Sequence, residues 1–249
     1  MKHELGIPAG GCMLRAELRM AEHPAGIVVL VHGSGTTRHD SLNRFVAASL
    51  VRTGFAALLV DLLEDCEAHE RHNVFGVEAQ AKRLVAVKDW LRSQPGTRLL
   101  DIGYFGTDVG AGVVLMAAAK APQGVGALVA RGGRPDTALS SLCRVEAPTL
   151  FIASESGTDR DWVEAAYRAT GAWKDLVHIA GAGDSFREPR ANEAVAQYAC
   201  RWFSRHLAPP LEPSIRETDL KQRHPGVALR DAFNAASAQL EALDVSHRV

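Results

Sequence analysis

The stretch Gly103-Tyr104-Phe105-Gly106-Thr107-Asp108-Val109-Gly110-Ala111-Gly112 joins an apolar run to a series of small residues. The apolar run predicts a strand over 101–105, and the residues after Asp108 predict a helix over 109–120. Glycines on both sides relieve the crowding of a sharp strand-to-helix turn, as in the pattern G-x-S-x-G, here with aspartate at the centre. We therefore expect Asp108 to lie exposed at the carboxyl edge of a sheet, above a helix N-terminus.

The rest of the chain alternates between strand-like and helix-like segments. Continuous apolar runs at 26–31 and 56–60 are typical of strands that are covered on both faces. A repeat of this kind predicts an α/β protein with a mostly parallel, doubly wound sheet flanked by helices. Further strands are expected over 13–20, 126–130, 149–153 and 176–180, and helices over 41–52, 76–93, 160–170 and 189–206.

Composition narrows the class of protein. The 249 residues are 47% hydrophobic and 23% charged, which is ordinary for a globular chain. Lys and Arg (28) nearly balance Asp and Glu (29), so the basic excess of a nucleic-acid binder is missing. The longest apolar run, Val113 to Ala119, is far short of the roughly 20 residues that cross a bilayer. With no secretory leader and no paired cysteines, we expect a cytoplasmic protein whose partner is a small molecule.

The pattern of strands, helices and prolines along the chain predicts two regions. We expect a single α/β domain over residues 11–207, because the strand-helix alternation ends there. A linker with three prolines follows in the stretch Leu207 to Pro213. Helical periodicity returns over 227–243, so residues 208–249 are expected to form a linker and a C-terminal helical tail. That tail either docks as one helix or forms a homo-oligomer contact.

A second glycine-rich loop, Val31-His32-Gly33-Ser34-Gly35, follows the strand at 26–31. Loops of this kind supply backbone N–H groups for an oxyanion hole. The N–H groups of Ser34 and Val109 would form the pair. The glycines at 106, 110 and 112 do not have the G-x-G-x-x-G spacing of a dinucleotide site, so no cofactor is expected.

These two loops, in this order, resemble the α/β-hydrolase fold and, within it, the dienelactone-hydrolase-like proteins. The resemblance runs from about residue 11 to residue 207. It includes His32-Gly33-Ser34-Gly35 with Arg38-His39, the strand that ends in Val60-Asp61, the turn Gly106 to Gly110, Arg131 to Asp136, and Phe186-Arg187-Glu188-Pro189. The resemblance implies a hydrolase with a nucleophile at the turn and a histidine before the last core helix.

The sequence departs from that family pattern at two positions. Asp108 stands where the family has serine or cysteine, and Asp184 stands where it has histidine. The acid of the triad would come from the loop after 149–153, where Glu155 and Asp159 are candidates, although Asp159 could equally be a helix N-cap. A Ser-His-Asp mechanism cannot operate with these residues.

Three interpretations remain open. The pocket survives as a binding site without chemistry. Alternatively, Asp108 is itself the nucleophile, as in the dehalogenase and epoxide-hydrolase branches of the fold, with Asp184 or His39 activating water. In the third interpretation Asp108, Asp184 and Glu155 bind Mg²⁺ or Ca²⁺.

The charged residues on the rim of the expected pocket indicate the charge of its ligand. Arg38, Arg131 and Arg134 suggest an anionic small molecule, because guanidinium groups match carboxylate and phosphate geometry, or they neutralise the carboxylates instead. His32 is expected to position its own loop beside the substrate. If Asp108 and Asp184 lie within hydrogen-bond reach, one of them, more readily Asp184, should hold its proton.

Overall fold

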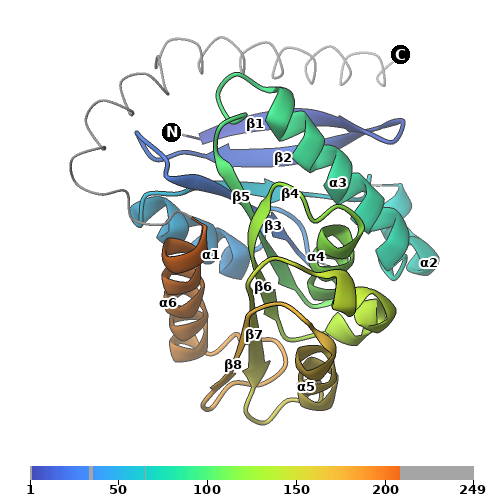
Figure 1. Ribbon diagram of the computed structural model, residues 1–249, viewed down its shortest axis with the longest axis vertical. Coiled ribbons are helices and arrows are strands. Elements are labelled where there is room, and N and C mark those ends of the chain that lie inside the picture. Colours follow the sequence, from blue (N-terminus) through green and yellow to red (C-terminus); the bar gives the residue numbers. More distant parts are fainter. Residues whose placement is uncertain (1, 34–35, 65, 208–249) are drawn as a thin grey trace.

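The computed structural model describes residues 2–33, 36–64 and 66–207, and these form one eight-stranded sheet with helices on both faces (Figure 1). The strand order is β1-β2-β4-β3-β5-β6-β7-β8. Strands β3 to β8 run parallel to one another, while β2 is antiparallel to β1 and to β4. The expected α/β-hydrolase architecture is confirmed. The strands are β1 (Lys2–Ala9), β2 (Cys12–Arg19), β3 (Gly26–Val31), β4 (Ala56–Val60), β5 (Asp101–Thr107), β6 (Val125–Arg131), β7 (Thr149–Ser154) and β8 (Lys174–Ile179).

Two layers of helices bury the two faces of the sheet. On one face α1 and α6 pack against each other, and on the other face α3, α4, α5 and η2 lie together (Figure 1). Strands β3 and β4 are buried along their whole length, as their unbroken apolar runs predict. The helices are α1 (Ser41–Arg52), α2 (Arg71–Val74), α3 (Val77–Ser93), α4 (Val109–Lys120), α5 (Arg160–Ala169) and α6 (Pro189–His206), with the 3₁₀ segments η1 (Glu67–His69) and η2 (Pro135–Arg144).

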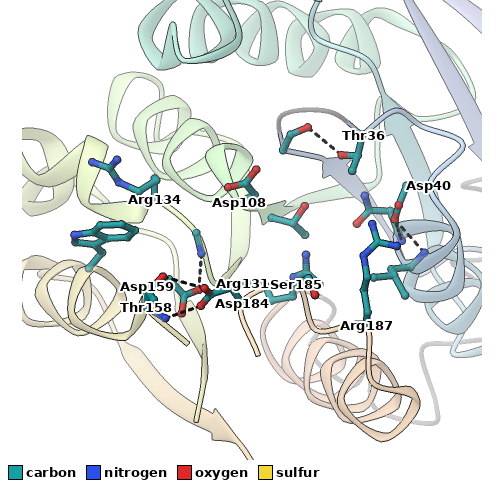
Figure 2. A pocket seen from close by; sticks show the side chains of 16 residues that line it. Thr36, Asp40, Asp108, Arg131, Arg134, Thr158, Asp159, Asp184, Ser185 and Arg187 are labelled. Carbon is teal, nitrogen blue, oxygen red and sulfur yellow. Dashed lines mark hydrogen bonds between the residues drawn. The ribbon is translucent and has the colours of Figure 1, made fainter. Parts of the chain in front are cut away.

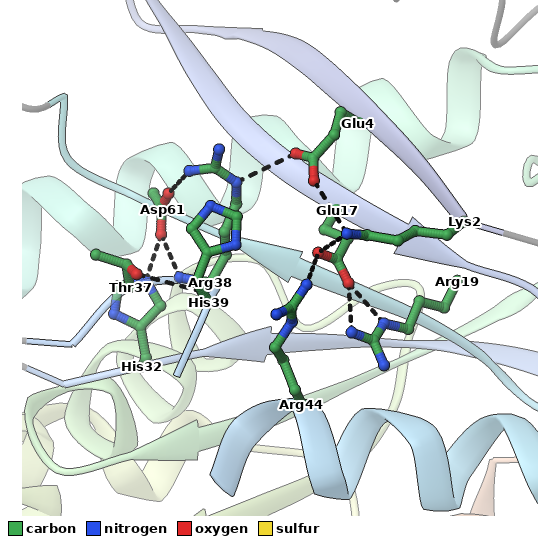
Figure 3. A network of polar contacts seen from close by, with 10 residues as sticks. All are labelled: Lys2, Glu4, Glu17, Arg19, His32, Thr37, Arg38, His39, Arg44 and Asp61. Atoms are coloured by element: carbon green, nitrogen blue, oxygen red, sulfur yellow. Dashed lines mark hydrogen bonds and ion pairs between the residues drawn. The ribbon is translucent and has the colours of Figure 1, made fainter. Parts of the chain in front are cut away.

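The sheet starts earlier in the chain than the expected domain boundary at residue 11. Strand β1 pairs with β2 through eight residues, from Lys2 opposite Arg19 to Ala9 opposite Cys12. The fully buried Glu17 on β2 binds Lys2, Arg19 and Arg44, so charge as well as backbone pairing joins β1 to the domain (Figure 3). The polar residues of β1 conceal its strand character, because an outer strand needs only one apolar face.

Two expectations concern residues outside the described part. Ser34, one of the expected oxyanion donors, is not described, and neither is the tail at 208–249, so its helix and the oligomer contact stay predictions. Among the described residues, none of the helices has both the length and the apolar character that a membrane crossing needs.

Candidate functional site

Asp108 lies at the turn between β5 and α4, at the carboxyl edge of the sheet. Its backbone angles are φ 55° and ψ −124°, in a region that non-glycine residues rarely adopt. Its N–H donates to the carbonyl of Arg131 at 3.3 Å, and its carbonyl accepts from the N–H groups of Ala111 and Arg134. A Cβ added to Gly33 would overlap the Asp108 side chain, and one added to Gly133 would overlap its backbone. The strained turn is therefore held by hydrogen bonds and enclosed by two glycines.

A cavity of about 340 Å³ opens beside this turn (Figure 2). Its lining includes five of the predicted site residues: Asp108, Arg131, Arg134, Asp159 and Asp184. The sequence interpretation did not include Asp40, Thr158 and Trp162, which also line it. Asp40 precedes α1 and accepts hydrogen bonds from Leu42 and Asn43, so its sequence signal is that of an ordinary N-cap.

The loops after β7 and β8 bring Asp159 and Asp184 together. Asp184 accepts hydrogen bonds from the N–H and hydroxyl of Thr158, at 2.7 and 2.9 Å. Asp159 accepts from Ser154 Oγ at 2.9 Å and from the N–H of Gly133 at 2.7 Å. Although Asp159 occupies the N-cap position of α5, its side chain makes no capping hydrogen bond and turns toward the cavity.

Asp159 is buried, with 2% of its surface exposed. Burial raises the pKa of its carboxyl above the ordinary value. Hydrogen bonds from Ser154 and Gly133 oppose that rise, and the negative charge of Asp184 adds to it. The structure thus adds Asp159 to the pair of Asp108 and Asp184, in which the sequence interpretation expected the shared proton.

Glu155 and His39 lie outside this cavity. Glu155 is exposed and accepts a hydrogen bond from the N–H of Gly181 at 2.9 Å. His39 is exposed and lies beside Arg38 on the loop before α1 (Figure 3). Neither is among the residues that line the cavity beside Asp108.

His32, Arg38 and Asp61 form a network of polar contacts (Figure 3). Asp61 Oδ1 accepts from His32 Nε2 at 2.8 Å and from the N–H of Arg38 at 2.7 Å, and Asp61 Oδ2 binds the Arg38 guanidinium at 2.5 Å. Burial alone would raise the pKa of Asp61, but these partners outweigh it and lower the pKa. Arg38 also pairs with Glu4 at 3.3 Å.

A second cavity of about 340 Å³ lies on the side of His32 and Asp61. Gly33 and Thr36 line both cavities, and Val109, the other expected oxyanion donor, lines only the second. His32 and Arg38 were expected at the rim around the ligand. The structure places their polar groups on Asp61, away from the carboxylates beside Asp108.

Two of the three arginines that line the first cavity, Arg134 and Arg131, differ in their partners. Arg134 binds Asp136 through two hydrogen bonds of 2.9 Å and stacks over the Trp162 ring, with Cζ 4.5 Å from the centroid. Arg131 packs over the Phe186 ring at 4.9 Å, and its Nε is buried without a hydrogen-bond partner.

The carboxylates do not gather around a shared ion position. Among the described residues, the group of three potential ligands close enough to hold a metal is Cys12, Glu64 and Glu67. Arg83 already binds Glu67 through both oxygens and contacts Cys12 Sγ at 3.1 Å. Asp108, Asp184 and Glu155, the Mg²⁺ or Ca²⁺ ligands of the third interpretation, do not form such a group of three in the described part of the chain.

Comparison with known proteins identifies the family. The Dienelactone hydrolase family matches residues 14–208, most of the chain, and the chain belongs to that family. A dienelactone hydrolase structure from Anabaena variabilis ATCC 29413 is 40% identical, with a TM-score of 0.81, over 83% of this chain and 98% of that one. A putative dienelactone hydrolase from Klebsiella pneumoniae is 20% identical, with a TM-score of 0.66, over 82% and 98%, and shares the fold.

Curated relatives from two strains of Mycobacterium tuberculosis are described as putative phosphoribosyl transferases. Each is 45% identical over 210 residues, which cover 83% of this chain. The chain spans about half of their length, 47%. Their description therefore applies to proteins with a further region that this chain does not match.

Proposed function

We propose that this chain binds a small polar molecule in the cavity beside Asp108 and does not hydrolyse esters through a nucleophile, imidazole and carboxylate. One observation carries the proposal. The described residues lining that cavity include four carboxylates and three arginines, but neither a histidine nor a cysteine. A serine or thiol hydrolase needs a nucleophile within reach of a base, usually an imidazole, that takes its proton. Asp184 stands where that base would be, and Thr158 holds it by two hydrogen bonds.

The turn at Asp108 and the cavity beside it support a ligand-binding function without catalysis. Asp108 keeps the strained backbone of a nucleophile elbow, and the loops after β6, β7 and β8 still enclose a cavity. A fold positions a site without specifying its reaction. Replacement of both reacting groups, with the enclosure preserved, is what a change from catalysis to binding would leave.

A second candidate function is hydrolysis with Asp108 as a carboxylate nucleophile. The backbone at φ 55° favours it, because the same turn presents nucleophiles in active members of the fold. The ester intermediate would need a base to activate water. Asp159 is the cavity carboxyl whose pKa is raised, but its two oxygens already accept hydrogen bonds from Ser154 and Gly133.

Isotope labelling separates these two functions. The protein is incubated under single-turnover conditions in oxygen-18 water with activated esters, lactones, epoxides and haloalkanes, and the peptide with Asp108 is weighed by mass spectrometry. We expect no label in that peptide. Oxygen-18 in the Asp108 carboxyl, absent from an Asp108→Asn control, would overturn the binding proposal and establish the carboxylate nucleophile.

The relatives suggest which ligands to test first. Their description names an enzyme that handles a phosphorylated ribose, and the chain is 45% identical to part of those proteins over 210 residues. We propose that phosphorylated sugars belong among the candidate ligands of this cavity. Thermal shift assays of the purified chain with sugars, sugar phosphates and nucleotides test this, and a rise in Tm identifies a binder.

A further inference from the structure

Three carboxylates of the cavity, Asp40, Asp159 and Asp184, accept hydrogen bonds from backbone N–H and hydroxyl groups. Asp40 Oδ1 accepts from the N–H groups of Leu42 and Asn43, at 3.0 and 3.1 Å. Asp184 and Asp159 accept from the N–H and hydroxyl groups described above. These acids therefore do not depend on an arginine for their hydrogen bonds, and a carboxylate has lone pairs left for further donors.

Among the described residues, the guanidinium of Arg131 has no hydrogen-bonding partners of this kind. It is the last residue of β6, and Figure 2 shows it among the aspartates of the cavity. Its Nε is buried and unpartnered, and among the described residues its guanidinium packs over Phe186 and forms no hydrogen bond or ion pair. The residue is partly exposed, and it lines the cavity.

Electrostatics agrees with this geometry. Burial lowers the pKa of Arg131 to about 10, and the attraction of Asp40, Asp108 and Asp159 only partly offsets that effect. The guanidinium is still charged at neutral pH. A buried cation without hydrogen-bonding partners destabilises a folded protein, and such a group in a cavity calls for an acceptor that the chain does not supply.

We propose that Arg131 binds the oxyanion group of a hydroxylated small molecule, a sugar phosphate or a sugar acid. The inference rests on the proposed binding function and names its ligand class. A guanidinium presents a planar set of donors that matches two oxygens of a phosphate or carboxylate. Asp108 and Asp184, beside it, then accept hydrogen bonds from the hydroxyl groups of the same ligand. A volume of about 340 Å³ lies at the lower end of ligand cavities, which suits a single sugar ring.

Calorimetric titration of the full chain tests the proposal with four probes at constant ionic strength. These are ribose 5-phosphate, ribonate, ribose and inorganic phosphate. We expect one of the first two to bind at least tenfold more tightly than ribose or phosphate alone, because only they combine oxyanion and hydroxyl groups. A stronger response to ribose 5-phosphate identifies a phosphate site, and a stronger response to ribonate identifies a carboxylate site.

The variant Arg131→Met separates a binding role from a structural one. Methionine keeps an unbranched apolar chain over Phe186 but removes the unpartnered charge, so we expect an unchanged or higher Tm and at least tenfold weaker binding. Arg160→Gln removes an exposed positive charge of α5 that lies outside the cavity lining, and it should bind as the parent chain does. Arg131→Lys, which keeps the charge without the planar donors, should bind with intermediate affinity.

Two results would overturn the assignment of Arg131. One is binding by Arg131→Met at the affinity of the parent chain, which together with a lower Tm would make the arginine structural. The other is no response to any of the four probes at millimolar concentration. In each case a ligand of another charge could still raise the Tm of the parent chain, so the binding function itself is judged separately.

Discussion

Asp159 and Asp184 place their Oδ1 atoms around a single glycine, Gly157. A Cβ added there would collide with Asp184 and come within 2.9 Å of Asp159. The negative charge of Asp184 accordingly contributes to the raised pKa of Asp159. The electrostatic pair of this cavity thus joins the loops after β7 and β8.

The raised pKa of Asp159 makes stability depend on pH with a defined sign. The folded chain holds this proton more strongly than the unfolded chain does, so Asp159 lowers the free energy of unfolding as pH rises through the ordinary aspartate range. We expect Asp159→Asn to remove that loss, so that the variant gains stability relative to the parent chain between pH 4 and pH 7. Urea unfolding at the two pH values measures it. The exposed Asp161→Asn serves as the control, and a relative loss at pH 7 for Asp159→Asn would contradict the prediction.

The position of Asp184 predicts how hydrolysis can be restored. Asp108→Ser alone should give no hydrolysis of an activated ester, because no imidazole lines the cavity among the described residues. Asp108→Ser with Asp184→His should exceed the single variant by about 10²-fold, since general base catalysis contributes that much. Asp159 is placed to orient the new imidazole.

Initial rates with a nitrophenyl ester measure this effect, and the triple variant with Asp159→Asn is the control that should lose most of the gain. If the single Asp108→Ser variant matched the double variant, a base outside the lining would be active, and His39 would be replaced next.

The glycine beside Asp108 should be sensitive to substitution. Gly133 has φ 67°, and an added Cβ would overlap the Asp108 backbone. We expect Gly133→Ala to lower the free energy of unfolding by about 2–4 kcal/mol, from the backbone conformation and the overlap together.

Gly181 is the matched control, because its φ is 70° and nothing lies within 4 Å of an added Cβ. Gly181→Ala should cost about 1–2 kcal/mol, the backbone part alone. Chemical denaturation compares the two variants, and equal losses would show that the contact with Asp108 is relaxed without cost.

Glu17 anchors the N-terminal strand. Burial would raise its pKa, but hydrogen bonds from Lys2, Arg19 and Arg44 outweigh burial and lower the pKa. Its contribution to stability is therefore present above the ordinary glutamate range and lost as pH falls. Glu17→Gln should lower the free energy of unfolding at pH 7 by about 2–3 kcal/mol, since it removes the charged carboxylate that Lys2, Arg19 and Arg44 share.

The exposed Glu78, which pairs with Lys82 and Lys120, is the control for Glu17. Glu78→Gln should leave the unfolding midpoint unchanged, because exposed ion pairs contribute little. Equal midpoints for the two variants at pH 7 would contradict an anchoring role for Glu17.

The sequence predicted the bounds of strands and helices with strong hydrophobic patterns. It missed strand β1 and the start of β8, which backbone pairing with a neighbouring strand defines. The helix at 41–52 and the strands at 26–31 and 56–60 have their expected bounds, because hydrophobic periodicity is strong there. Strand β1 was missed because its first three residues, Lys2, His3 and Glu4, are polar. The strand expected at 176–180 is instead Lys174–Ile179, since backbone pairing with β7 extends it toward polar residues.

The sequence predicted several residues of the candidate site better than it predicted which of them contact one another. The resemblance placed Asp108, Asp159 and Asp184 on loops at one sheet edge, and all three line the cavity. Which carboxylates interact depends on loop conformation, and the contacts around Gly157 have no sequence pattern. Arg38 and Arg131 look alike in the sequence, yet Arg38 has Asp61 and Glu4 as partners while Arg131 packs on a ring.

Because Arg131 lies on a strand, a ligand that binds there costs less conformational entropy. Its backbone is in register with Thr107 on one side and Ile152 on the other, so both neighbouring strands fix its position. A ligand that binds at Arg131 therefore orders only a side chain, at about 0.5–1.5 kcal/mol, without ordering any loop around it. Association at such a preorganised group requires no prior rearrangement of the backbone, and differences in affinity among ligands should appear mainly in their dissociation rates.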